Sequence, residues 1–497
     1  MNSTTKQASL FAALIPIIFL IVLLGLNVYF FKSDSSYGAN QIALLLAAAV
    51  AGFVGLKYGS NWKIIYNGIV ESISSAMGAV IILLLIGALA GTWLLSGVVP
   101  AMIYCGLQVL NPTIFLVAAC IICAVVSIAT GSSWSTIATV GIALLGIGQV
   151  LGLSTGWIAG AIISGAYFGD KMSPLSDTTN VAPAVAGTDL FTHIRHMVWT
   201  TAPSFIISLI VFTIVGFRNT TTYDSVKVDE LLALLDTTFN INAFLFLVPA
   251  AMIILIWKKM PAIPALFLGS LIGGIFALIY QPDLVARIAG DADGYIEQSY
   301  KAIITSMSVE TTGYFEAENN IINEIFDVPV ENRSSLLKAG GMVGMMNTVW
   351  LIICALTFGG VMQATGLLRR ITEALLKLVN SVGSLIATTA GTCIFFNVTA
   401  SDQYLAIVVP GKMYDQAFKD YDLAPENLSR TLEDAGTVTS VLIPWNTCGV
   451  AQSGVLGVAV LLYAPYCIFN WVSPLMTILF GYMGWKITPL KKEKLAK

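Results

Sequence analysis

Residues 169–180 read GDKMSPLSDTTN, a run of polar residues around one proline inside a strongly apolar region. Pro174 has no backbone N–H and clashes with the preceding turn, so a helix that crosses this region should break there. A break leaves backbone polar groups unpaired, and at membrane depth these are tolerated only where they line a cavity or meet a bound ion. The stretch therefore predicts a broken transmembrane helix beside a polar site.

The rest of the chain fits a membrane setting. Its 497 residues have a mean hydropathy of +0.82, with 57% hydrophobic and only 11% charged side chains. A helix needs about 20 mainly apolar residues to cross the hydrocarbon core. Runs of this kind recur at roughly 13–31, 41–56, 66–96, 113–129, 135–152, 198–217, 242–257, 261–280, 347–366, 381–396 and 461–485. We therefore expect an all-α polytopic membrane protein with lipid as its solvent.

The second half of the sequence repeats features of the first. Residues 130–133 (TGSS) correspond to 399–402 (TASD), and PLSDT at 174–178 corresponds, after one inserted residue, to PWNTC at 444–448. Internal repeats are common in transporters. Placing the Lys and Arg residues of short loops in the cytoplasm gives the helix 66–96 and its counterpart 347–366 opposite directions, with both termini cytoplasmic. The repeats are therefore predicted to be inverted.

This pairing divides the chain into five parts. We predict N-terminal transmembrane helices at 1–65, a first inverted repeat at 66–217, linking helices and an extracytoplasmic loop at 218–346, a second inverted repeat at 347–485, and a basic cytoplasmic tail at 486–497. Each repeat should contain a re-entrant hairpin, at about 113–152 and 382–411, and a broken helix, at about 156–192 and 431–458.

Four polar stretches interrupt the apolar runs and supply candidate ligands: 130–136, 169–180, 397–402 and the region from Glu433 to Thr447. Hydroxyl, amide and carbonyl oxygens suit sodium, and the ends of half-helices add their dipoles. We place sodium at Asp177, Asp402 and neighbouring hydroxyls. The full set of predicted ion- or substrate-binding residues is Thr130, Ser132, Ser133, Asp170, Ser173, Ser176, Asp177, Thr178, Asn180, Asn397, Thr399, Ser401, Asp402, Asn446 and Thr447.

Carboxylates within these stretches are candidates for proton coupling, because charged side chains are costly in a membrane and mark function there. The candidates are Asp170, Asp177, Asp402, Glu433 and Asp434. A carboxylate that binds either a cation or a proton is the simplest basis for exchange. We expect the first repeat to hold the charge and the second to complete the ligand shell, with Asp402 at its hairpin tip. Lys171 should neutralise Asp170 or extend toward the interface.

Other chemistry-bearing residues favour ordinary structural roles. The seven cysteines lie in or beside apolar stretches, so a disulfide framework is not expected, and Cys120 and Cys123 are interpreted as small hydrophobic residues. His193 and His196 flank Arg195, and we interpret them as residues of the membrane interface rather than as metal ligands. No cofactor and no nucleic-acid partner is expected.

Three long motifs resemble the NhaC family of sodium/proton antiporters: residues 129–134 (ATGSSW), 169–183, and 431–440 (TLEDAGTVTS) continuing through 444–449. The resemblance spans essentially the whole chain. It implies a fold of the ion transporter superfamily, with a scaffold domain, a mobile transport domain, elevator-type alternating access and a homodimer in the plasma (inner) membrane. It also covers relatives that exchange malate for lactate with sodium and protons.

Three functions remain open at this point. A sodium/proton antiporter fits the abundance of carboxylates and hydroxyls, with Lys171 as the only basic residue of the candidate site. An exchanger of organic anions or amino acids would need a cationic or helix-terminus clamp for a carboxylate. An intramembrane aspartyl protease would use two membrane aspartates that share a proton, but its Gly-x-Gly-Asp pattern is interrupted by Tyr167. We expect a transporter and no enzymatic activity.

Overall fold

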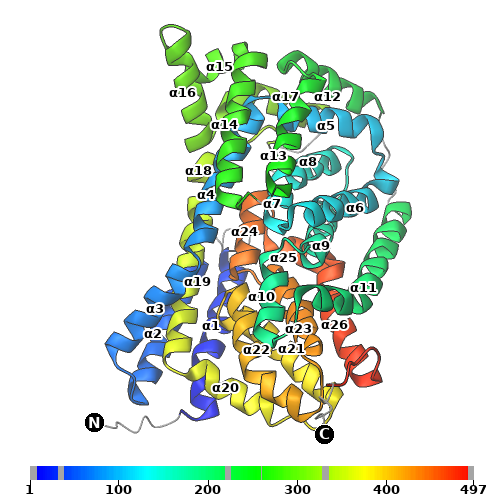
Figure 1. Ribbon diagram of the computed structural model, residues 1–497. Helices are drawn as coiled ribbons and strands as arrows, with labels where there is room; N and C mark the ends of the chain where they lie inside the picture. The colour runs from blue at the N-terminus through cyan, green and yellow to red at the C-terminus, as the bar shows by residue number, and fades with distance from the viewer. Residues whose placement is uncertain (1–7, 32–37, 219–224, 259, 327–334, 491–497) are drawn as a thin grey trace.

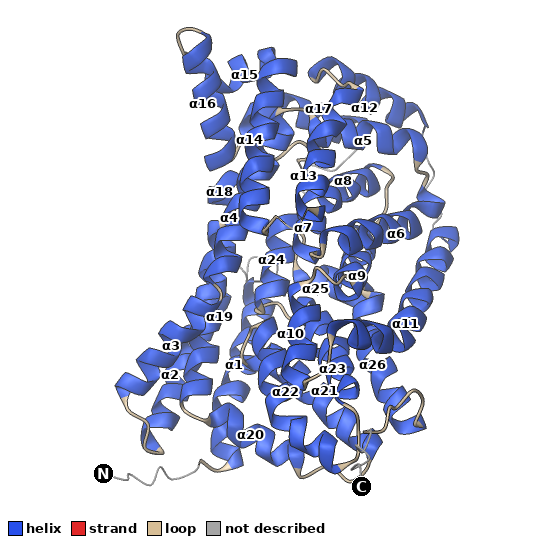
Figure 2. Cartoon of the chain, in the orientation of Figure 1, coloured by secondary structure: helices blue, strands red, loops and turns tan. Residues whose placement is uncertain are grey.

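The computed structural model describes residues 8–31, 38–218, 225–258, 260–326 and 335–490, and the regular elements in these ranges are helices (Figures 1 and 2). Nine of the described helices are long and apolar enough to cross a membrane, or up to eleven if two sharply bent pairs each form one span. The chain is therefore an all-α polytopic membrane protein, as predicted. Part of the predicted cytoplasmic tail, residues 491–497, lies outside the described ranges.

Four helices pack together at the lower left of Figure 1: α1 (Leu10–Phe31), α2 (Ala39–Lys57), α3 (Trp62–Ser75) and α19 (Met346–Ala364). The prediction of one helix over 66–96 is wrong, because α3 ends at Ser75 and α4 (Met77–Leu95) begins after a bend at Ala76. The amide of Ala76 donates to the carbonyls of Ile73 and Ser74, which tightens the last turn of α3. The bend directs α4 into the upper half of the molecule.

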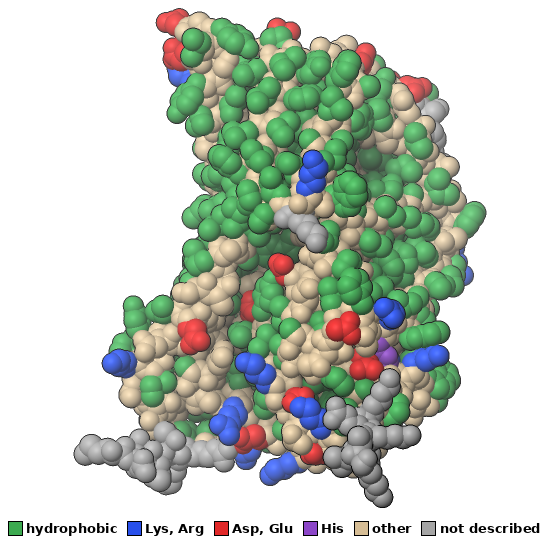
Figure 3. Space-filling model, viewed as in Figure 1, with side chains coloured by type: hydrophobic (Ala, Val, Ile, Leu, Met, Phe, Trp, Pro, Cys, Tyr) green, Lys and Arg blue, Asp and Glu red, His purple; other side chains and the backbone are tan. Residues whose placement is uncertain are grey.

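In the upper half, α4 packs along α14 (Ala262–Tyr280) and α16 (Tyr295–Ser308). The other elements there are α5 (Val98–Val109), α12 (Ser225–Thr238), η3 (Ala243–Phe246), α13 (Leu247–Trp257), α15 (Pro282–Ala289), η4 (Thr312–Phe315), α17 (Glu316–Ile325) and α18 (Gly341–Gly344). Figure 3 shows hydrophobic side chains over much of the visible face, with Lys and Arg mainly toward the end formed by α20 (Leu367–Leu376) and α22 (Gln403–Asp420). An apolar surface of this extent fits contact with lipid.

The first hairpin and broken helix are built around α6 (Pro112–Thr130) and α9 (Thr155–Met172), which pack along each other. Gly131, with φ 69°, turns the chain after α6, and the Ser132 hydroxyl caps the next helix by accepting from the amide of Ser135 at 3.2 Å. The chain then runs through α7 (Ser133–Thr136), the π-helical segment η2 (Ile137–Gly141) and α8 (Ile142–Val150). This order places the turn of the hairpin at Thr130 to Ser133.

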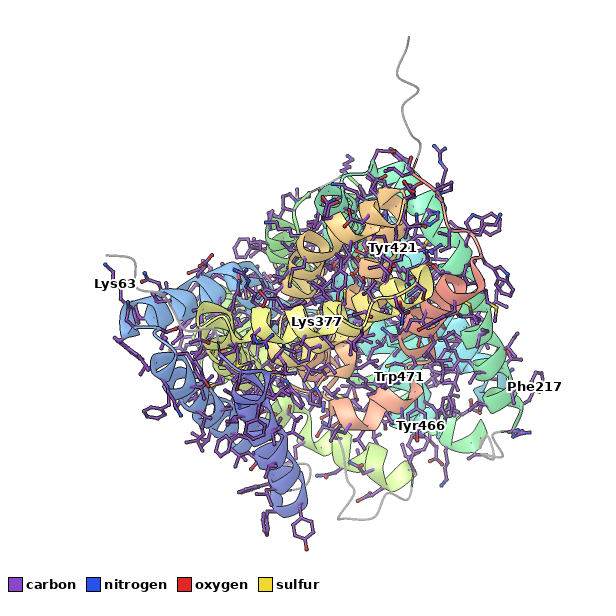
Figure 4. The ribbon with its side chains drawn as sticks, turned by 90° about the horizontal axis from the view of Figure 1, so that it is seen from below. Lys63, Phe217, Lys377, Tyr421, Tyr466 and Trp471 are labelled. Carbon is purple, nitrogen blue, oxygen red and sulfur yellow. The ribbon has the colours of Figure 1, made fainter. Side chains whose placement is uncertain are left out.

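After α9 the chain leaves helical geometry at residues 173–176, which include Pro174, and resumes as α10 (Asp177–Ala186). Gly187, with φ 80°, ends α10. The next helix, α11 (Leu190–Arg218), begins within the range of about 156–192 that was predicted for the broken helix. Seen from below, Phe217 near the end of α11 and Lys63 near the start of α3 lie at opposite edges of the molecule, with Lys377 between them (Figure 4).

The second half contains a hairpin of α21 (Val382–Thr399) and α22, joined at residues 400–402. Ser401 has a φ of 60°, and the Asp402 carboxylate caps α22 by accepting from the amide of Leu405 at 2.9 Å. The chain again leaves helical geometry around its proline, at residues 443–446. The elements after α22 are α23 (Pro425–Leu432), the π-helical η6 (Glu433–Thr437), η7 (Ser440–Leu442), α24 (Thr447–Leu456), α25 (Val460–Tyr463), η8 (Ala464–Tyr466) and α26 (Ile468–Met483).

Replacing Gly165 by alanine should destabilise the protein, because a Cβ at this position of α9 would lie 2.0 Å from the carbonyl oxygen of Cys120 in α6. Overpacking of this kind costs about 1–3 kcal/mol. The matched control is Gly391→Ala in α21, where a Cβ would meet no heavy atom within 4 Å. Thermal unfolding of the purified variants should show a lower midpoint for Gly165→Ala only. Equal midpoints would contradict the close packing of α6 and α9.

Candidate cation-binding cavity

A cavity of about 890 Å³ lies where the two hairpin turns meet the break between α9 and α10. One side is formed by the turn after α6, by residues 174–178, by the first turn of α22 and by the start of α24. The opposite side is formed by the bend between α3 and α4 and by the connection from α13 to α14. Segments far apart in the sequence therefore meet around one space, because both helix breaks and both hairpin turns point to it.

About half of the predicted binding residues line this cavity: Thr130, Ser132, Asp170, Ser176, Asp177, Thr178, Asp402 and Thr447. The other predicted residues lie near these in the sequence but do not line the cavity: Ser133, Ser173, Asn180, Asn397, Thr399, Ser401 and Asn446. Several of these form hydrogen bonds within the fold: the Ser173 hydroxyl donates to the carbonyl of Ile128, and that of Thr399 to the carbonyl of Phe395, both at 2.8 Å.

Asp170 connects the broken helix to the first hairpin. It lies near the end of α9 and is 8% exposed, with its carboxylate at the cavity wall. Its Oδ2 accepts from the hydroxyl of Ser133 at 2.6 Å and from the amide of Ser133 at 3.1 Å. Ser133 therefore acts on the site through Asp170, although it does not line the cavity itself.

Asp177 and Asp402 bring two further carboxylates to the same cavity. Asp177 is the first residue of α10 and is exposed, whereas Asp402 precedes α22 and is 5% exposed. The Tyr404 hydroxyl donates to Asp177 Oδ2 at 3.4 Å, so the second hairpin reaches the start of α10. The positive ends of two helices thus meet carboxylates at one place, which partly offsets the cost of these charges.

The side-chain amides of Asn397 and Asn446 fix the backbone around the non-helical residues 443–446. The side-chain nitrogen of Asn446 donates to both oxygens of Asn397, at 3.1 Å each, and that of Asn397 donates to the carbonyl of Gly436 at 2.7 Å. The amide of Thr447 donates to the carbonyl of Ser401 at 2.9 Å. These bonds join the hairpin turn to the start of α24 and to η6. In this conformation the two side-chain amides bond to each other and to the backbone, and neither lines the cavity.

Lys171 has a different partner from the one expected. It is completely buried and forms an ion pair with the equally buried Asp434 of η6, so the prediction that it neutralises Asp170 or extends to the interface is wrong. The second oxygen of Asp434 accepts from the Thr200 hydroxyl of α11 at 2.8 Å, and Lys171 also donates to the Ser473 hydroxyl of α26 at 3.1 Å. The pair forms because α9, η6, α11 and α26 converge at this point.

The two histidines pack inside the protein on one face of α11. His193 is fully buried and His196 is 9% exposed, because this face of α11 packs against α23. The Nδ1 atom of His193 lies 2.7 Å from the Ser429 hydroxyl. Both side chains are therefore packed within the protein, whereas Arg195 between them is exposed. Within the described ranges, no group of three or more His, Cys, Asp or Glu side chains is placed to hold a metal ion.

Several lining residues were not singled out from the sequence. Gln403 and Tyr404 follow Asp402 directly, and Trp134 and Ser135 follow the first hairpin turn, so proximity to a predicted ligand was the available signal. The opposite wall, with Ser75 and Met260 among its residues, carries no such signal. These residues face the cavity only because the bend at Ala76 and the α13–α14 connection lie across from the hairpins.

The charged side chains that line the cavity are all acidic among the described residues. Its described lining contains the carboxylates of Asp170, Asp177 and Asp402 together with several hydroxyls, and no Lys, Arg or His. An acidic site between broken membrane helices is suited to a small cation. Together with the many apolar helices, this arrangement defines a multi-pass membrane transporter.

The chain belongs to the Na⁺/H⁺ antiporter family, whose model matches residues 165–485. It is 38% identical over 444 residues to the Na⁺/H⁺ antiporter NhaC of Alkalihalophilus pseudofirmus, covering 89% of this chain and 90% of that protein. It is 35% identical to the malate-2H⁺/Na⁺-lactate antiporter of Bacillus subtilis, covering 92% of each chain. It is 34% identical to the arginine/ornithine antiporter ArcD of Halobacterium salinarum, covering 97% of this chain and 93% of that protein.

Proposed function

We propose that the protein exchanges sodium for protons across the plasma membrane, with sodium held in the cavity by Asp177, Asp402 and neighbouring hydroxyls. The single observation that carries this proposal is the meeting of three carboxylates in one cavity whose described lining has no basic side chain. Carboxylate and hydroxyl oxygens can replace the water around a sodium ion. The relative from Alkalihalophilus pseudofirmus, a Na⁺/H⁺ antiporter by name, supports the same cargo.

Alternating access of elevator type, in a homodimer, is part of this proposal. The two hairpins and the two broken helices, within the repeats 66–217 and 347–485, would form the moving domain. Matched features support the repeat itself: a positive φ at both hairpin turns, at Gly131 and Ser401, and a side-chain cap after each proline, at Ser176 and Asn446. The scaffold would include α3, α4 and the α13–α14 connection, which form the opposite wall of the cavity. Both termini would be cytoplasmic.

Exchange of a cationic amino acid is the second candidate. The cavity volume of about 890 Å³ exceeds the needs of a bare sodium ion and lies within the usual range for small-molecule sites of about 300–1,000 Å³. Trp134 and Tyr404 add aromatic faces to its acidic lining, a combination that suits an organic cation. The relative from Halobacterium salinarum is named an arginine/ornithine antiporter. Malate or lactate fits less well, because an organic anion would face these carboxylates.

Proteoliposomes with an internal pH dye distinguish these cargoes. The purified protein is challenged in turn with sodium, lithium, potassium, malate, lactate, arginine and ornithine. Sodium should drive proton movement without any added organic solute. Protein-free liposomes provide the background rate. Movement of protons or sodium only when an organic solute is present would reject sodium/proton exchange, and a response to arginine or ornithine would establish the second candidate.

A further inference from the structure

A second group of titratable side chains lies behind the cavity wall, around η6. Glu433 is the first residue of this π-helical segment and is completely buried. Neither of its carboxylate oxygens has a partner at hydrogen-bond geometry within the described residues, although the Thr437 hydroxyl lies near enough to act on it. An ionised carboxylate in such a place would lose its hydration without replacement, which is among the costliest arrangements in a protein interior. The neutral, protonated acid avoids most of this cost.

The charges around Glu433 also favour its neutral, protonated form. The groups that act on it electrostatically are the ammonium of Lys171 and the carboxylates of Asp170 and Asp434. Lys171 is already bound to Asp434, whose other oxygen is held by Thr200. One positive charge thus faces two negative ones before Glu433 is counted.

Arg430, also buried, directs one nitrogen to the carbonyl of Lys486 at 3.0 Å, beyond the end of α26. Its charge acts on Asp434 and on His196, and its Nε and Nη2 atoms have no partner among the described residues. The two buried cations, Lys171 and Arg430, are therefore outnumbered by the acids Asp170, Asp434 and Glu433 when all three are ionised.

We propose that Glu433 holds the exchanged proton, at a site separate from the cation cavity. This inference rests on the proposed sodium/proton exchange, and it selects one carboxylate from the five considered. Glu433 itself is not among the residues that line the cavity. A proton can occupy such a position where a hydrated sodium ion cannot, because the proton needs no room for a hydration shell.

Asp170 provides the link between the two sites, because it lines the cavity and also acts on Glu433. Sodium beside Asp170 adds a positive charge near Glu433, which favours the ionised carboxylate and expels its proton. A proton on Glu433 in turn removes a negative charge near Asp170, which weakens the attraction of the cavity for sodium. Since linkage between two binding equilibria is reciprocal, each ion weakens the binding of the other. Antiport requires this opposition.

The test separates sodium binding from proton coupling. Glu433→Gln keeps the size of the side chain and imitates the protonated acid. In proteoliposomes this variant should still exchange external for internal radioactive sodium, at a higher sodium concentration than the wild type needs, whereas sodium-driven proton movement should fall to the protein-free background. Glu426→Gln, a change of another acidic residue one helix earlier in α23, is the matched control and should keep both activities. Wild-type rate of coupled exchange by Glu433→Gln would overturn the inference.

A second measurement keeps the inference testable in the wild-type protein. Purified protein in weakly buffered detergent with a pH dye should release protons when sodium is added, and Glu433→Gln should not. Equal release by both proteins, or loss of sodium self-exchange together with coupling in Glu433→Gln, would overturn the inference. Absence of sodium-driven proton movement in the wild type would instead reject the proposed function, so the two failures are distinguishable.

Discussion

Replacement of Lys171 by methionine is expected to destabilise the protein strongly, because it leaves the buried carboxylate of Asp434 without its cation. Removal of one partner from a buried ion pair costs about 3–5 kcal/mol. Methionine keeps most of the apolar stem of lysine, so the loss reports mainly on the charge. The thermal midpoint of the purified variant in detergent, and the yield of monodisperse protein, should both fall.

The double variant Lys171→Met with Asp434→Asn is the matched control. It removes both charges, and the asparagine oxygen can still accept from the hydroxyl of Thr200 or Ser473. Neutral replacement of both partners is often tolerated, so stability should recover most of the way toward the wild type. A double variant as unstable as Lys171→Met would show that the charge imbalance is not the cause.

Replacement of Asp402 by asparagine should remove sodium-coupled exchange while the protein stays folded. Asparagine can still cap α22 through its side-chain oxygen, so the local helix is retained. The cavity, however, loses one negative charge. An interaction with a charged group is worth about 1.5–3 kcal/mol, which corresponds to roughly 10- to 150-fold in sodium affinity. Asp177→Asn should have the same direction of effect. Sodium titration of proton flux in proteoliposomes measures both.

Asp415→Asn is the matched control on the same helix, because Asp415 forms an exposed ion pair with Lys419 at 2.6 Å. Surface pairs of this kind contribute little, so this variant should exchange sodium for protons at the wild-type rate. Full activity in both Asp402→Asn and Asp177→Asn would reject the cavity as the sodium site.

The sequence predicted the positions of the polar breaks well, since each break follows from a local cause. Pro174 and Pro444 lie in non-helical turns, and Asp170, Asp177 and Asp402 all reach one cavity. The same reasoning did not separate side chains that face the cavity from side chains that hold its walls together. Asn397 and Asn446 have the residue type of a ligand, yet they bond to each other and to backbone carbonyls.

The partners of buried charged groups were the least predictable part. Lys171 follows Asp170 in the chain, and sequence proximity suggested that the two would pair. Successive residues of a helix point in different directions, however, so Asp170 faces the first hairpin and the cavity, while Lys171 faces η6. The burial of His193 likewise depends on how α11 packs against α23.

By itself, the sequence determined that this chain is a membrane protein of many helices, where its helices break, and that acidic residues stand at those breaks. Hydropathy, the missing amide of proline and the cost of a charge in lipid are properties of short segments. Only the tertiary structure decided which carboxylates share a cavity, that Lys171 pairs with Asp434, and that Glu433 is buried where no described residue meets its oxygens at hydrogen-bond geometry. These outcomes depend on residues hundreds of positions apart, which are brought together only when the hairpins and half-helices pack against one another.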